Sequence, residues 1–295
     1  MNRSLAFLGF LAAAALASAQ PSATMRPSLL SSVSVETSYS SEETVARGAT
    51  DLGELSITHY GVSFSRRHVL SESGSLTYGL AYTAHELDAT GPLPLPETLA
   101  ELSLNLGWQH RLSPQWSVAV FARPGFYGDF EELDADSLNV PLLALANYAV
   151  SPDLVWSFGL NVNAFSDNPV LPVVGVRWQF APGWTFNVGF PRSGFTWQVT
   201  EQLALRAGVG LQGGSFRITE NLGIPAPGIA RLANTYVDYR EVRAGLGLDY
   251  ALGDRLSLAL DAGAVTDRKF DYFDRSYRLD SDTGFYGALA LKTSF

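Results

Sequence analysis

Residues 102–122 read LSLNLGWQHRLSPQWSVAVFA, which is two alternating runs joined by a short turn. In each run an apolar residue occupies every second position, as in Leu102, Leu104 and Leu106 before the turn. Because successive side chains of a strand point to opposite faces, this stretch predicts a β-hairpin whose strands each have one apolar face.

Short turns of this kind recur along the chain, and the connections between successive copies are longer, polar and irregular. The six copies lie at residues 70–72, 112–116, 150–154, 180–184, 199–203 and 252–256. This alternation of connection lengths predicts an all-β fold, an antiparallel up-and-down transmembrane β-barrel with tight turns at one rim and larger loops at the other. We expect about fourteen strands in a single domain at residues 32–295, or twelve if the two strands of segment 184–199 merge.

A soluble sandwich or a lipocalin-like barrel would turn the same apolar faces inward. Three observations favour apolar faces that point toward lipid. The polar faces are rich in Gly and Asn, charged residues make up 17% of the chain where about 25% is usual for soluble proteins, and aromatic residues gather at the strand ends beside the short turns. Such aromatic residues are typical of a girdle at the membrane interface.

The first residues match a secretory signal peptide at residues 1–19: Arg3, an apolar run, and the small residues Ala17-Ser18-Ala19. We expect a flexible lead-in at residues 20–31.

The chain has no Cys and a net charge of −9, which argues against disulfides, thiolate metal sites and nucleic acid as a partner. No later run of 18 or more apolar residues occurs, which excludes a helical membrane protein. We therefore expect an exported protein of the bacterial outer membrane.

The last segment alternates from Phe285 to the final residue, Phe295. This end resembles the terminal signal of bacterial outer-membrane proteins, although Thr293 stands where an aromatic residue is commoner. The resemblance implies that Phe295 is part of an assembly signal read by the barrel assembly machinery. The segment Gly189-Phe190-Pro191-Arg192 is similar to one in an uncharacterised, domain-of-unknown-function family of predicted outer-membrane proteins. Outer-membrane lipid and lipopolysaccharide would surround such a barrel.

Charged residues on the polar faces are the candidates for lining the lumen, because a charge on the lipid face costs about 2–4 kcal/mol at the membrane midplane. They form a charge ladder across a water-filled pore or pair and plug a narrow one. The set comprises Glu101, Arg123, Arg177, Arg206, Arg243, Asp249, Asp261 and Lys292.

A second set of candidates is the acidic segment between Tyr127 and Leu138. It is an exterior loop or, if it folds into the lumen, a constriction that favours cations. Its acidic residues are Asp129, Glu131, Glu132, Asp134 and Asp136.

Catalysis and metal binding find little support. The four His residues are scattered and none is followed two residues later by Ser, so no nucleophile and base are paired as a lipid hydrolase requires. Asp residues between Thr266 and Asp282 alternate with Arg and Lys, which favours ion pairs over a calcium site. We predict no catalytic residue, cofactor or metal.

Two functions therefore lead, and an outer-membrane lipid hydrolase is a less favoured third. The first is a passive or weakly selective porin-like channel for small solutes. The second is a non-conducting structural or surface-interaction barrel whose long loops, Gly214 to Thr235 and Thr266 to Asp282, bind a partner.

One irregularity is expected in the wall, because the apolar residues change phase between Leu55, Ile57 and Tyr60, which suggests a β-bulge near His59 and Gly61.

Overall fold

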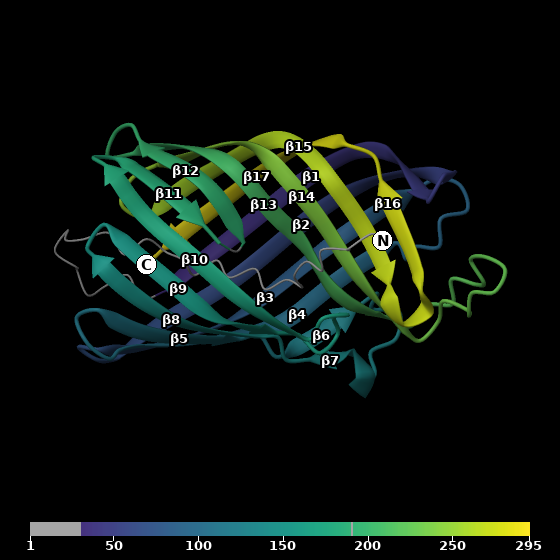
Figure 1. Ribbon diagram of the computed structural model, residues 1–295, viewed down its shortest axis with the longest axis horizontal. Coiled ribbons are helices and arrows are strands. Elements are labelled where there is room, and N and C mark those ends of the chain that lie inside the picture. Colours follow the sequence, from purple (N-terminus) through teal and green to yellow (C-terminus); the bar gives the residue numbers. More distant parts are fainter. Residues whose placement is uncertain (1–30, 190) are drawn as a thin grey trace.

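The computed structural model describes residues 31–189 and 191–295. Seventeen β segments in this part of the chain form one sheet that closes on itself (Figure 1). The expected signal peptide and all of the lead-in except Ser31 lie outside the described residues. The segments are β1 (Ser31–Arg47), β2 (Thr50–Ser71), β3 (Gly74–Ala89), β4 (Thr98–Arg111), β5 (Trp116–Ala122), β6 (Gly125–Gly128), β7 (Leu138–Asn139), β8 (Leu142–Ser151), β9 (Leu154–Val162), β10 (Val170–Ala181), β11 (Trp184–Val188), β12 (Arg192–Gln198), β13 (Leu203–Ile218), β14 (Thr235–Ala251), β15 (Leu256–Tyr272), β16 (Tyr277–Ser281) and β17 (Gly284–Ser294).

Three pairs of these segments are single strands with an interruption. β4 pairs with both β5 and β6, which are separated at Pro124, and β15 pairs with both β16 and β17. β7 and β8 are separated at Pro141 and pair with β6 and β5 in turn. Proline has no N–H to donate to the ladder, which accounts for the first and third of these breaks. The described chain therefore forms a closed antiparallel barrel of fourteen strands, as predicted.

The barrel closes between β1 and β17, where Ser32 to Ser40 pair with Ser294 to Tyr286. At the end of this seam the Ser31 and Phe295 backbones exchange hydrogen bonds of 3.1 and 2.9 Å. The short turns lie at the same end as this seam closure, at the left of Figure 1, and the longer connections lie at the right. We call these the turn end and the loop end.

The apolar faces point outward. Leu104 is 49% exposed although it lies in the middle of β4, and its sequence neighbours Ser103 and Asn105 point inward. All six Trp side chains are at least partly exposed on the outer face, and Trp184 stacks on Trp197 of the neighbouring strand with ring centroids 5.2 Å apart. Within the described residues, no helix is long and apolar enough to cross a membrane.

The predicted bulge near His59 and Gly61 is wrong. β2 pairs with β3 without a shift from Leu55 to Val69, so the backbone keeps its register there. The nearest shift is in β1, between Ser40 and Glu43. Apolar residues change phase in β2 because Leu55 and Ile57 point inward to a buried cluster, whereas Tyr60, Val62 and Phe64 point outward.

The prediction of a long loop from Thr266 to Asp282 is also wrong, because β15 and β16 pair with each other through most of this segment. A short 3-10 turn, Phe273–Arg275, connects them. The other expected loop is shorter than predicted, since β13 continues to Ile218 and β14 begins at Thr235. The connection at residues 219–234 is the longest in the described part of the chain, and it extends furthest to the right in Figure 1.

The two faces of β4 give a test of this orientation. Leu104→Arg places a charge in lipid and is expected to lower the free energy of unfolding by about 2–4 kcal/mol. Asn105→Arg, one residue further along, points inward and is expected to cost less. Urea unfolding of the barrel refolded in lipid measures both values. An equal or larger loss for Asn105→Arg would contradict the orientation.

Candidate functional site in the barrel interior

At the loop end a contact across the barrel divides the interior. Arg217 of β13 pairs in parallel with Gly128 of β6, and the Asp129 N–H donates to the Arg217 carbonyl at 3.1 Å. Five strands of the wall separate β6 from β13. Their contact therefore closes a smaller ring of β1 to β4, β6 and β13 to β16, from which β8 to β12 are excluded.

The smaller ring encloses an apolar core. Tyr239 and Phe270 stack with ring centroids 4.9 Å apart, and both are almost completely buried. The core fills this end of the barrel and excludes water from it. Its residues are Val45, Leu55, Ile57, Leu87, Leu95, Leu99, Tyr127, Phe165, Phe216, Ile218, Leu232, Val237, Tyr239, Phe270, Tyr272, Tyr277 and Leu279.

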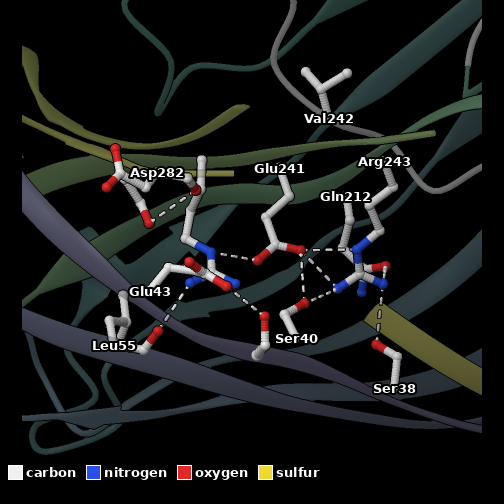
Figure 2. A network of polar contacts seen from close by, with 12 residues as sticks. Ser38, Ser40, Glu43, Leu55, Gln212, Glu241, Val242, Arg243 and Asp282 are labelled. Carbon is white, nitrogen blue, oxygen red and sulfur yellow. Dashed lines mark hydrogen bonds and ion pairs between the residues drawn. The ribbon is translucent and has the colours of Figure 1, made fainter. Parts of the chain in front are cut away.

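On the turn side of the core lies a layer of buried charged side chains (Figure 2). Glu241 accepts from Arg268 at 2.7 Å and from Arg243 at 2.7 Å, and the Glu241 and Arg268 side chains are completely buried. Arg243 also donates to Ser38 and Ser40 of β1 at 3.1 and 3.0 Å. Because β15 and β17 separate β14 from β1 in the wall, these bonds cross the interior. Glu241 therefore holds two guanidinium groups that would otherwise be buried without a counter-charge.

A second set of polar groups lies beside this layer. Arg123 forms an ion pair with Glu101, and both side chains are nearly buried. His59 and His85 face each other with ring centroids 4.7 Å apart, and His85 also packs edge-on against Tyr239. Neither His bonds to a Ser within the described residues. The predicted inward residues Glu101, Arg123 and Arg243 thus meet at one level, where they close the interior.

On the turn side of this layer the interior is open to water. We call this chamber the vestibule. The Glu36 side chain is 49% exposed although it points inward from the middle of β1 and contacts His59 Nε2 at 3.2 Å. Many inward positions around it are Gly or Ser, which leave space. Space that water can occupy therefore lies beside Glu36, in the middle of the barrel.

The remaining predicted inward residues lie in the vestibule. Arg206 of β13 contacts Asp249 at 2.7 Å and Asp261 at 3.1 Å, which joins three neighbouring strands. Arg177 of β10 and Lys292 of β17 alternate with outward apolar residues, so they point inward as well. The sequence thus supplied eight candidates, which the structure distributes between the closed layer and the open vestibule.

A connection that the sequence did not single out covers the ends of the short strands. β12 begins opposite Gly210 of β13, whereas β13 continues to Ile218, so the wall is low at β11 and β12. Residues 163–169, between β9 and β10, cross this low wall. Asn163 donates to Ser215 at 3.1 Å and Ser166 to Asp238 at 3.1 Å. We call residues 163–169 the strap.

The strap also makes an apolar contact, because the Phe165 ring packs against Tyr236 with centroids 4.7 Å apart. Together with the bonds to β13 and β14, this contact holds the strap down on the smaller ring. The only sequence signal for it is Asn163, a polar residue that bonds to Asn139 at 2.7 Å and is buried.

The acidic segment between β6 and β7 lies mostly in solvent. Glu131, Glu132 and Asp136 are exposed, whereas Asp129 is buried and accepts from Thr219 Oγ1 and the Thr219 and Glu220 N–H groups at 2.6 to 2.8 Å. Hydrogen bonds from the Ser137 hydroxyl lower the pKa of Asp134, with a further contribution from its N–H. The segment therefore fastens two loops together on the outside.

The described part of the barrel interior offers no cluster of metal-ligating side chains. Among the described residues, no group of three or more His, Cys, Asp or Glu side chains is arranged to hold a metal ion.

The closed barrel with an apolar exterior is the architecture of outer-membrane β-barrel proteins, and solved structures share it. One is the COG4313 outer membrane channel from Pseudomonas putida F1, with a TM-score of 0.53 and 11% identity over 92% of this chain and 97% of that chain. Another is a deletion mutant of TodX, described as a monoaromatic hydrocarbon channel, with a TM-score of 0.54 and 11% identity over 92% and 91% of the two chains. At this identity the likeness concerns the fold alone.

Residues 69–279 match the family described as Domain of unknown function (DUF6268). The chain belongs to this family. No curated protein matches the sequence.

The buried charge layer gives a second test. Glu241→Gln is expected to lower the free energy of unfolding by about 3–5 kcal/mol, because it leaves Arg243 and Arg268 buried without a carboxylate. Asp249→Asn is the control. Its carboxylate is 45% exposed and Arg206 keeps Asp261, so a change below about 1 kcal/mol is expected. Urea unfolding in lipid compares the two, and equal losses would contradict the layer's importance.

Proposed function

We propose that this protein is an outer-membrane channel that admits small solutes, passively or with weak selectivity. The half-exposed Glu36 carries the proposal, because an inward side chain in the middle of β1 can be exposed only if there is space for water inside the barrel. A polar chamber of this kind suits the passage of small solutes better than a purely structural role. The two structural neighbours are described as channels, which supports the same function.

The conduit is closed at the loop end in this conformation. The apolar core is too tightly buried for solutes to pass through it. The strands outside the smaller ring, β8 to β12, bound the other route, and the strap covers it. We propose that displacement of the strap connects the vestibule with the exterior, because hydrogen bonds to Asn139, Ser215 and Asp238 and one side chain in the core, Phe165, hold it.

A hydrolase is not favoured. His59 packs against His85, which also packs against Phe216 and Tyr239, and no hydrogen bond joins either His to a serine hydroxyl in the described structure. The arrangement of residues in the interior therefore favours transport over catalysis.

The non-conducting barrel is the second candidate, and the dry core at the loop end favours it. In this alternative the protein binds a partner through the loop at residues 219–234, which projects beyond the barrel (Figure 1). The core would then support the loop, since Leu222 and Ile229 pack against it.

Shortening the strap separates the two candidates. We expect replacement of residues 164–168 by two glycines to increase the single-channel conductance of the refolded protein in planar bilayers, because the contacts of Phe165, Ser166 and Asp167 with β14 are removed. Asn168→Ala is the control, since its side chain bonds only to Asp167 within the strap. A barrel with heat-modifiable gel mobility that stays silent in all three forms would contradict the channel and favour the second candidate.

Export and assembly give a further test. We propose that the barrel assembly machinery recognises the last strand and that lipid and lipopolysaccharide surround the apolar belt. Deletion of Phe295 is expected to abolish the heat-modifiable form in outer membranes, because it also removes the backbone bonds to Ser31. Refolding of the same variant in detergent reports on stability alone. Normal assembly of the truncated chain in cells would contradict the recognition.

A further inference from the structure

Four basic side chains face the vestibule without an acidic partner. They are Arg67 of β2, Arg111 of β4, Arg177 of β10 and Lys292 of β17, and none makes an ion pair within the described residues. Their orientation follows from register. Arg67 pairs with Thr77, whose neighbours Leu76 and Tyr78 are exposed on the outer face, and Lys292 pairs with the inward Ser34 and Ser257.

The carboxylates of the vestibule, in contrast, are all engaged. Asp261 is held by Arg206 at 3.1 Å and by Arg192 at 3.2 Å, and Asp249 is held by Arg206 at 2.7 Å. Glu36 bonds to His59. Among the described residues of this chamber, Glu36 is therefore the one acidic side chain without an Arg or Lys partner, and it does not balance four basic groups.

The charge of this chamber is opposite in sign to the net charge of the whole protein. The chain carries a net charge of −9, and much of the acidic excess lies in exposed connections. At the turn end, Glu72, Asp153, Glu201 and Asp254 lie in the turns, where water screens them. Charges inside a narrow chamber with low-dielectric walls act more strongly on an entering ion than charges at the rim.

Lys292, Arg67 and Arg111 lie on the alternate strands β17, β2 and β4, with Arg111 at the rim. Arg177 lies across the barrel on β10, so the four groups flank the path from two sides. Rings of Arg and Lys are the arrangement by which pores select anions. We propose that the vestibule selects small anionic solutes that carry carboxylate or phosphate groups. This inference rests on the proposed channel function. It is also contrary to the cation preference that an acidic constriction would produce.

The reversal potential of the strap-shortened protein in a KCl gradient tests the proposal. We expect a chloride permeability above that of potassium. In the variant R67Q/R111Q/R177Q/K292Q the ratio is expected to fall about threefold or more, because the field that concentrates anions is removed. Arg66→Gln is the matched control, since Arg66 neighbours Arg67 but pairs with the outward Tyr78. It is expected to keep the ratio.

Binding of a small sulfonated fluorescent dye, followed by anisotropy at low salt, gives a readout that needs no conduction. We expect the wild type and Arg66→Gln to bind the dye and the quadruple variant to lose the binding. Cation selectivity, or a quadruple variant that keeps both selectivity and dye binding, would overturn the inference and leave the channel intact. A silent barrel that binds the dye through these four residues would contradict the channel function but support the anion site.

Discussion

Backbone hydrogen bonding in a membrane is the constraint on which this structure depends. Lipid offers no partner for an N–H or a carbonyl, so a sheet that crosses it must close on itself. Here the closure is the seam between β1 and β17, from Ser32 to Ser40 on one side and Ser294 to Tyr286 on the other. Closure then assigns one face of every strand to lipid and the other to the interior, and the alternating sequence satisfies both.

The same barrel holds two different interiors. At the turn end, small and polar residues leave a chamber in which Glu36 is half exposed. At the loop end, the contact between Arg217 and Gly128 closes a smaller ring, and aromatic and aliphatic side chains fill it. The charge layer around Glu241 divides the two. Because two of its members are completely buried, it stays in place only while each guanidinium keeps the carboxylate.

The alternation of side chains between the two faces of each strand predicted more of the inward-facing residues than any sequence motif did. The eight candidate charges were found because a charge on the lipid face is costly, and this rule depends on local alternation alone. Their pairing was not predictable. Arg243 reaches Ser38 across the interior, over a sequence separation that no local pattern encodes. The change of phase at Leu55 and Ile57 was visible in the sequence but was wrongly interpreted as a bulge, since an inward apolar residue makes sense only once the buried cluster is known.

The sequence by itself determined the antiparallel barrel, its fourteen strands, the outward apolar face and the positions of the short turns, because period-two alternation and turn composition are local properties. Only the tertiary structure decided that the loop end is closed and that residues 163–169 cross the low wall at β11 and β12. It also decided that four basic groups of the vestibule make no ion pair with another described residue. These features depend on contacts between distant strands, and such contacts arise only when the barrel has closed.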